Sequence, residues 1–255
     1  MAYKEILAYL DPFADTEVRL KFAIDLAASH GARLIGMDAC SDGAFEGEWR
    51  DRAVGLRDRF QEAIKLAGVE GAYRSAKGGR HEYAHYADLI IAPQPEYEAR
   101  DVIIAGIPEE VLVSAGVPVL LLPQGWKPRG PIENIVIAWR SSREATRAVH
   151  DAMPLLARAK KVTAFTFAPD SGFFGKEPDL LVNHLRAHGV AAEADSWPDT
   201  GEISAVDALF ACLETQEADL IVAGAYGHSR LVEGLFGGVS RDLVRQPSLP
   251  ILMSH

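Results

Sequence analysis

Four glycines near the end of the chain are spaced so that they could bind a phosphate. The apolar run 218–223 is followed by Gly224 and Gly227, and nine residues later by Gly237 and Gly238. A short apolar run of this kind predicts a buried parallel strand. Because glycine has no Cβ, its backbone can approach a phosphate closely, and the amides of a following helix start point at it. The pattern predicts two segments closing on one anion or, alternatively, a glycine-capped strand-to-helix turn.

The spacing differs from the common nucleotide fingerprints. A dinucleotide-binding turn has G-x-G-x-x-G after the first strand of its unit, and a P-loop ends in Gly-Lys-Ser/Thr; neither pattern occurs. The arrangement Gly-x2-Gly-x9-Gly resembles the ATP-binding motif of the universal stress proteins. The similarity extends over 218–255, with Gly-Ala-Tyr-Gly-His-Ser-Arg at 224–230 and Leu-Pro-Ile-Leu-Met-Ser-His at 249–255.

The chain repeats itself at an offset of about 130 residues, half its length. Three segments recur in the same order: 5–11 as 134–140, 87–93 as 218–224, and 106–113 as 238–245. A repeat of this length indicates a duplicated domain rather than a solenoid, whose units span about 20 to 50 residues. Because the connector 123–131 is rich in proline and glycine, we predict domains over 1–125 and 131–255.

Strands and helices are expected to alternate in both halves. In the second half, apolar runs predict strands near 134–139, 161–167, 190–195, 219–223 and 249–253. Such alternation favours a parallel sheet covered on both faces. We therefore predict an α/β fold of two tandem, doubly wound, five-stranded parallel-sheet domains of the Rossmann-like, adenine nucleotide alpha hydrolase-like type. The family resemblance implies that the halves form an internal pseudo-dimer, and it leaves a further homodimer open.

Two helices of the second half have clear sequence signals. Ser141-Ser-Arg-Glu144 fits a capping box, and an apolar helical face follows at Ala145, Ala148, Ala152 and Leu156. Pro154 is expected to kink or divide that helix. A second apolar stripe predicts a helix through Ile203, Val206, Phe210 and Leu213.

Composition narrows the functional classes. The 255 residues carry a net charge of −10 with a pI near 5.3, which disfavours nonspecific binding to nucleic acid or to an anionic membrane. No apolar run reaches membrane-spanning length, and the first residues lead into a strand without a signal-peptide core. The two cysteines, Cys40 and Cys212, are too few for a disulfide framework and suit a reducing cytoplasm.

In a doubly wound sheet, ligands bind beyond the carboxyl ends of the strands at the point where the strand order reverses. The resemblance implies that ATP, with Mg²⁺ as its companion ion, binds in the second half. Backbone near Phe167 would face the adenine, and amides of the glycine segments would hold the phosphates. The predicted nucleotide-binding residues are Ala138, Trp139, Arg140, Phe167, Gly224, Gly227, Gly237, Gly238, Val239 and Ser240.

The sequence departs from the family pattern at two of these positions. ATP-binding universal stress proteins usually carry Asp where this chain has Arg140, which cannot accept a hydrogen bond. Arg140 is expected either to bind a phosphate bidentately or to pair with a carboxylate and fill the pocket. Gly238 replaces a usual Ser or Thr. In the first half Asp11 is kept, but the loop 93–101 is acidic and proline-containing, so we expect a degenerate motif there.

Pairs of histidines raise the question of metal binding. His81-Glu-Tyr-Ala-His85 matches the zinc-protease pattern H-E-x-x-H, and His184 and His188 are also four residues apart. No third ligand follows at a recognisable spacing, so we interpret both pairs as solvated helical residues. A surface metal clip is the alternative, and we assign no metal-binding or catalytic residue.

Three functions remain on these observations. The first is a cytoplasmic tandem universal stress protein that binds ATP, or a related adenine nucleotide, in its second half and responds to it. The second is a weak ATPase or nucleotidyl-transfer enzyme, for which carboxylates are scarce: Asp219 is expected at the wrong end of the sheet, and Asp170 is the nearby loop carboxylate. The third is a nucleotide-free interaction module with its site closed by Arg140.

Overall fold

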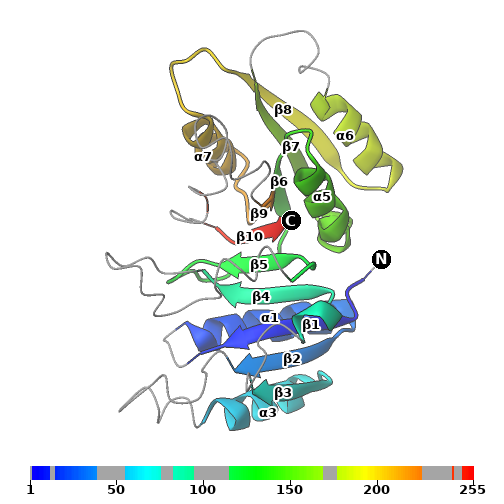
Figure 1. The fold of residues 1–255 in the computed structure, drawn as a ribbon, viewed down its shortest axis with the longest axis vertical. Coiled ribbons are helices and arrows are strands. Elements are labelled where there is room, and N and C mark those ends of the chain that lie inside the picture. Colours follow the sequence, from blue (N-terminus) through cyan, green and yellow to red (C-terminus); the bar gives the residue numbers. More distant parts are fainter. Residues whose placement is uncertain are drawn as a thin grey trace. The chain divides into compact units, whose positions relative to one another are not determined.

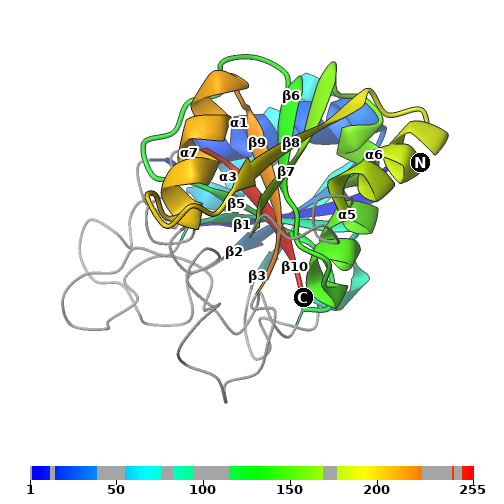
Figure 2. The ribbon, with the colours of Figure 1, turned by 90° about the horizontal axis from the view of Figure 1, so that it is seen from above.

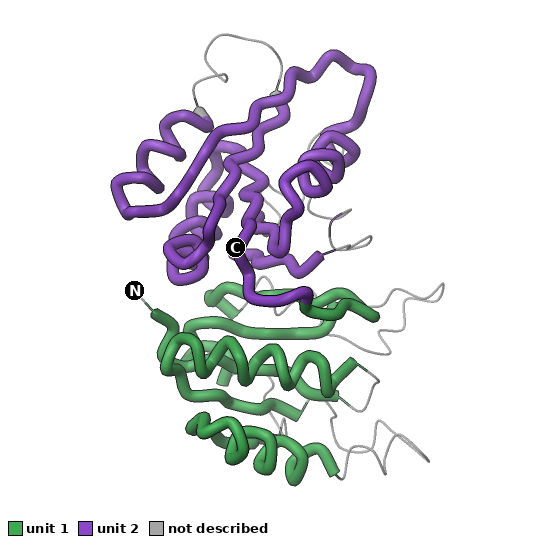
Figure 3. Tube along the Cα trace, turned by 180° about the vertical axis from the view of Figure 1, so that it is seen from behind, with its two compact units in different colours: residues 1–128 green, residues 129–255 purple. Residues whose placement is uncertain are grey.

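The chain divides into two compact units, residues 1–128 and 129–255 (Figure 3). Each unit contributes five strands, with helices packed against them; the strands and helices are labelled in Figure 1. The computed structural model describes residues 2–11, 15–38, 55–75, 83–94, 115–168, 177–225, 243 and 249–255.

Unit 1 is built from alternating strands and helices. Its sheet has the order β3-β2-β1-β4-β5, and every described pair of neighbours is parallel. The elements are β1 (Glu5–Leu10), α1 (Thr16–His30), β2 (Arg33–Asp38), α3 (Leu56–Ala67), β3 (Gly71–Ser75), a short 3-10 helix η1 (Ala84–Tyr86), β4 (Leu89–Pro93) and β5 (Val119–Leu122).

Unit 2 repeats this arrangement with the order β10-β9-β6-β7-β8, again parallel throughout the described pairs. In Figure 2, α7 lies on one side of its sheet, and α5 and α6 lie on the other. The elements are β6 (Asn134–Ala138), α5 (Arg143–Leu156), β7 (Lys161–Ala168), α6 (Glu177–Ala187), β8 (Ala192–Pro198), α7 (Ala205–Thr215), β9 (Leu220–Gly224) and β10 (Ile251–Ser254). The predicted fold class is confirmed.

The repeated Ala-Asp-Leu-Ile segment has a structural role in both units. Asp88 accepts hydrogen bonds from the backbone N–H groups of Lys4 and Glu5, and Asp219 accepts them from Glu133 and Asn134. Each carboxylate therefore fixes the beginning of the neighbouring central strand. Asp219 lies at the amino end of the sheet of unit 2, as predicted, away from the carboxyl ends of the strands.

Three local predictions about helices need correction. The N-cap of α5 is Ser142, not Ser141: the Ser142 hydroxyl accepts a hydrogen bond from Ala145 N at 3.1 Å. Pro154 does not divide α5, which continues through it to Leu156; the proline removes one i→i−4 hydrogen bond close to the end of the helix. The predicted face of α5 is buried as expected.

The stripe predicted for α7 was only partly right. The helix begins after Ser204, whose hydroxyl accepts from Asp207 N, so Ile203 precedes the cap and is 43% exposed. The buried face comprises Ala208, Leu209, Cys212 and Leu213.

Cys212 is a buried thiol, whereas Cys40 lies outside the described residues. It is fully buried in α7, and its Sγ donates to Asp195 Oδ2 at 3.6 Å. Burial, and then the nearby Asp195 carboxylate, raises the pKa of the thiol to about 12 from an ordinary 9.0. A thiol with this pKa is unreactive at neutral pH, because the thiolate is the nucleophile.

We expect Cys212 to resist a thiol–disulfide exchange reagent at pH 8 in the native protein and to react after denaturation. Mass spectrometry of labelled peptides tests this expectation.

The same pKa predicts that the protein loses stability at alkaline pH. The reason is that the unfolded chain loses this proton above about pH 9 and the folded chain does not. The Cys212 contribution to the free energy of unfolding should be constant below pH 9 and fall as pH rises towards 12. Chemical denaturation of wild type and Cys212→Ala across pH tests this expectation. The same pH dependence of the free energy of unfolding in both proteins would contradict it.

Candidate functional site

The reversal of strand order in unit 2 lies between β6 and β9. From β6 the chain passes to β7 on one side, and the later strands β9 and β10 lie on the other. The register pairs Ala138 with both Ala223 and Phe165. Trp139 N donates to Phe165 O at 2.8 Å, so this ladder continues one residue beyond β6. The carboxyl ends of β6, β7 and β9 therefore meet at one edge, where such folds bind ligands.

Half of the predicted nucleotide-binding residues are described by the structure, and they lie at this edge of the sheet. Ala138, Trp139 and Arg140 leave β6, Phe167 lies near the end of β7, and Gly224 ends β9. Arg140 is exposed, whereas Trp139 and Phe167 are half-buried. The other predicted positions, Gly227, Gly237, Gly238, Val239 and Ser240, lie outside the described residues.

Gly224 is required by the packing of α5. A Cβ atom at this position would lie 2.6 Å from Ala145 N and 2.8 Å from Glu144 C. Both are backbone atoms of the first turn of α5, so no side-chain rotation could relieve the overlap. The absence of a side chain at Gly224 therefore places the start of a 14-residue helix directly beside the end of β9. The first turn of a helix carries backbone N–H groups without intrahelical partners and a partial positive charge.

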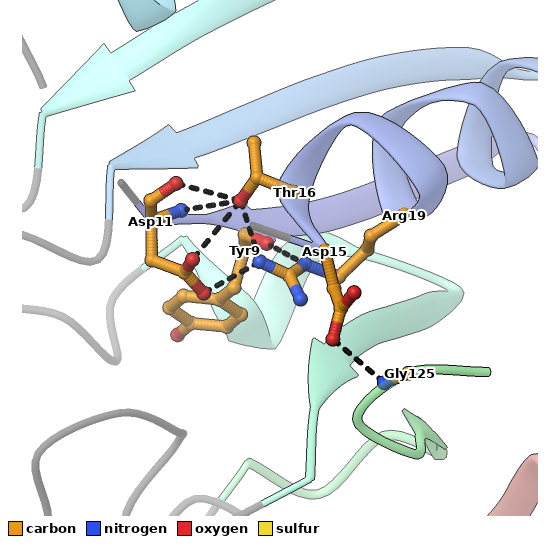
Figure 4. Close-up of polar contacts among 6 residues, drawn as sticks. All are labelled: Tyr9, Asp11, Asp15, Thr16, Arg19 and Gly125. Carbon is orange, nitrogen blue, oxygen red and sulfur yellow. Dashed lines mark hydrogen bonds and ion pairs between the residues drawn. The ribbon is translucent and has the colours of Figure 1, made fainter. Parts of the chain in front are cut away.

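The corresponding corner of unit 1 is occupied by an internal ion pair (Figure 4). Asp11, directly after β1, is 3% exposed, and Arg19 of α1 is equally buried. Arg19 Nη2 donates to Asp11 Oδ2 at 2.5 Å, and the Thr16 hydroxyl donates to the other Asp11 carboxylate oxygen at 3.0 Å. Arg19 Nε also donates to Tyr9 O at 2.8 Å. The carboxylate kept in unit 1 is therefore engaged within its own unit.

The start of α1 is tied down by a second acid. Asp15 Oδ2 accepts a hydrogen bond from Gly125 N at 2.7 Å, which joins the helix start to the segment after β5. Burial lowers the pKa of Arg19 from its ordinary value, and the Asp11 and Asp15 carboxylates oppose that shift. Because an arginine pKa starts so high, the guanidinium remains charged at neutral pH, and Asp11 compensates a buried cation.

The two units differ at this corner in a coordinated way. The buried positions of α1, Thr16, Arg19 and Leu20, have the same spacing as Ala145, Ala148 and Val149 of α5. Unit 2 thus has alanines at the positions of Thr16 and Arg19, and its own arginine, Arg140, at the position of Asp11. Sequence reasoning missed Arg19 and Thr16, although an acid at a strand end followed by a hydroxyl and an arginine on one helical face could have identified them.

The described histidines do not assemble a metal site. His85 Nδ1 lies 3.0 Å from Ala115 O, and His81 lies outside the described residues. The ring of His184 packs against those of His188 and His150, with centroids 4.7 and 5.5 Å apart. Desolvation, and then the neighbouring His188 and His150, lowers the pKa of His184. Among the described residues, no group of three His, Cys, Asp or Glu side chains could hold a metal ion.

Comparison with solved structures identifies this architecture. The strand order of both units is that of a doubly wound α/β fold. Solved structures with this fold match nearly the whole length of the chain. A universal stress protein from Archaeoglobus fulgidus DSM 4304 is 14% identical, with 98% of this chain and 95% of that chain covered and a TM-score of 0.72. A protein of Pseudomonas aeruginosa UCBPP-PA14, described as a universal stress protein, is 18% identical, with 99% and 93% covered and a TM-score of 0.65.

A universal stress protein solved in complex with cAMP matches about half of the chain. It is 23% identical, with 49% of this chain and 99% of that chain covered and a TM-score of 0.39. No protein-family model matches the sequence, and no curated protein matches it. The chain has the fold of a tandem universal stress protein, and the resemblance seen in its motifs is confirmed at the level of the fold.

None of the described helices combines the length and the apolar character needed to cross a membrane.

Proposed function

We propose that this chain is a nucleotide-responsive tandem universal stress protein that binds ATP, or a related adenine nucleotide, in unit 2. The contrast between the two corners carries the proposal. In unit 1 the acid after the first strand is buried against Arg19 and Thr16, whereas in unit 2 the same position carries an exposed arginine, shortly before the chain enters α5. An exposed cation next to helix N-terminal amides favours an anionic ligand.

Several features of unit 2 fit this ligand. Gly224 begins the glycine pattern 224–238 and allows the close approach of α5. Phe167 and Trp139 offer half-buried aromatic surface at the ends of neighbouring strands. ATP bound here would bias whichever conformation or partner-binding state holds it more tightly. A cytoplasmic location, an internal pseudo-dimer and a further homodimer belong to the same proposal.

Arg140 is proposed to bind a nucleotide phosphate. Its exposure supports contact with a ligand rather than filling of the pocket. Arg140→Gln should weaken ATP binding about tenfold, because a charge-assisted bond is lost or replaced by a neutral one. Isothermal titration with ATP and with adenosine measures this. Adenosine affinity should be unchanged, and an unchanged ATP affinity would contradict the role of Arg140. Arg147→Gln, on the exposed part of α5 where Arg147 pairs with Asp151, is the matched control and should bind ATP normally.

A weak ATPase is the second candidate, and the positions of its carboxylates make it less favoured. Phosphoryl transfer needs a metal holder and a group that orients the nucleophile. Asp219 is engaged at the amino end of the sheet, and Asp170 lies outside the described residues. Phosphate release that scales with protein concentration and disappears in Gly227→Val would reverse the ranking. A nucleotide-free interaction module is the third candidate, and it predicts no binding in the titrations above.

A further inference from the structure

Three positions lie level with one another at the carboxyl edge of the sheet in unit 2. Ser254 at the end of β10 is paired with Gly224. Ala138 is paired with Ala223, so Trp139 lies level with Gly224 on its other side. Level residues of a parallel sheet project to the same face. The missing Cβ of Gly224 faces the first turn of α5, so Trp139 and Ser254 flank that helix start.

Among the residues that the structure describes, the polar side-chain atoms of these two flanking residues have no hydrogen-bond partner. Ser254 is 2% exposed, and its Oγ is buried without a hydrogen bond. The indole Nε1 of Trp139 is also buried without one. Buried polar groups in folded proteins are nearly always hydrogen-bonded, and leaving one unpaired costs stability. Two such groups beside one helix start therefore point to a partner that a ligand supplies.

Unit 1 shows that the fold itself does not need polar groups at these positions. There, Leu122 pairs with Pro93, and the pairing of Ala8 with Ile91 brings Leu10 level with Pro93. The register thus matches Leu10, Pro93 and Leu122 with Trp139, Gly224 and Ser254. Leu10 and Leu122 are buried apolar residues, which is the ordinary composition of such an edge. Unit 2 has replaced both with side chains that can donate a hydrogen bond.

The chemistry of this corner selects for acceptors. An indole N–H and a guanidinium only donate, and a hydroxyl can donate. Ala145 N already donates to the Ser142 hydroxyl, so the amides that precede it in the first turn of α5 are the ones that can donate to a ligand. Glu144 is the opposing charge in that turn, and its carboxylate lies 3.5 Å from Arg143 Nε. A phosphate group, with several acceptor oxygens and negative charge, is the chemical class that fits a corner of donors.

We infer that Trp139 and Ser254 bind phosphate oxygens at the start of α5; this inference rests on the proposed function and assigns the phosphate end of the nucleotide to this corner. The Trp139 indole then acts as a hydrogen-bond donor through Nε1, in addition to any aromatic contact. The shared chemistry is phosphate, which free inorganic phosphate could also supply.

The test titrates the full chain with ATP, adenosine and inorganic phosphate. The variants are Trp139→Phe and Ser254→Ala, with Thr215→Ala as the matched control. The control removes a hydroxyl from the end of α7, where it donates to Ala211 O. Each corner variant should raise the Kd for ATP about tenfold, as for one bond to a charged group, and leave adenosine unchanged. Without ligand, Ser254→Ala should melt at or above the wild-type temperature, because an unpaired hydroxyl is gone.

The outcomes separate the two proposals. If ATP binds the wild type and both corner variants equally, the inference is wrong and the proposed function stands. Equal losses for ATP and adenosine would overturn the phosphate assignment. If inorganic phosphate binds with the same dependence on Trp139 and Ser254 while ATP does not bind, the corner is a phosphate site and the nucleotide function fails. If neither binds the wild type, both proposals fail.

Discussion

Replacing Arg19 by alanine is expected to lower the free energy of unfolding of unit 1 by about 3–5 kcal/mol, the usual cost of removing one partner of a buried ion pair. The substitution leaves the Asp11 carboxylate buried beside the Thr16 hydroxyl, without the guanidinium charge that compensates it. The loss is a large fraction of the total stability of a domain, about 5–15 kcal/mol. Chemical denaturation followed by circular dichroism measures it.

Two further variants make this expectation specific. Lys21→Ala removes an exposed pair on the same helix, Lys21 with Asp25, and should cost at most about 1 kcal/mol. The double variant Asp11→Leu/Arg19→Met replaces the buried pair by apolar groups and should recover most of the stability. If Arg19→Ala were as mild as Lys21→Ala, the ion pair would not be the compensated buried charge that the structure shows.

Introducing a side chain at Gly224 is expected to have the second large effect. Gly224→Ala should cost about 1–3 kcal/mol, as overpacking of a closely packed contact does, because its Cβ would overlap backbone atoms of Glu144 and Ala145. The start of α5 must then move away from β9. Under the proposed function this displaces the helix amides from the ligand, so ATP affinity should fall together with the melting temperature.

The control for this variant is a glycine with space around it. Gly189 follows α6 with φ +78° and no heavy atom within 4 Å of an added Cβ. Asparagine tolerates that left-handed conformation, so Gly189→Asn should cost less than about 1 kcal/mol and leave ATP binding intact. A Gly224→Ala protein with wild-type stability and wild-type ATP affinity would refute the packing role assigned to Gly224.

The architecture could be predicted because its signals are local and repeated. Apolar runs such as 218–223 occur in both halves and form central strands, and Asp88 and Asp219 mark the same point in each. Errors arose where a choice between adjacent residues depends on backbone geometry. The capping-box spacing to Glu144 favoured Ser141 in the sequence, whereas the backbone turn after β6 makes Ser142 the cap of α5.

The site was less predictable, because it depends on residues that the fold brings together from distant segments. Ser254 belongs to a strand far along the chain from Trp139, and the residues next to it in the sequence do not indicate that its hydroxyl is buried. Arg19 looks like an ordinary surface residue in the sequence, and only the packing of α1 reveals its pairing with Asp11. The glycine pattern, by contrast, is readable directly, although most of it lies outside the described residues.

The most direct test of nucleotide binding in unit 2 is to denature freshly purified protein in acid and identify any released nucleotide by chromatography and mass spectrometry. The account predicts an adenine nucleotide, bound in a single copy per chain and depleted in the Arg140→Gln protein. If no nucleotide is released, and titration of the purified chain with ATP and Mg²⁺ produces no binding signal, the central claim is wrong and the protein works without a nucleotide.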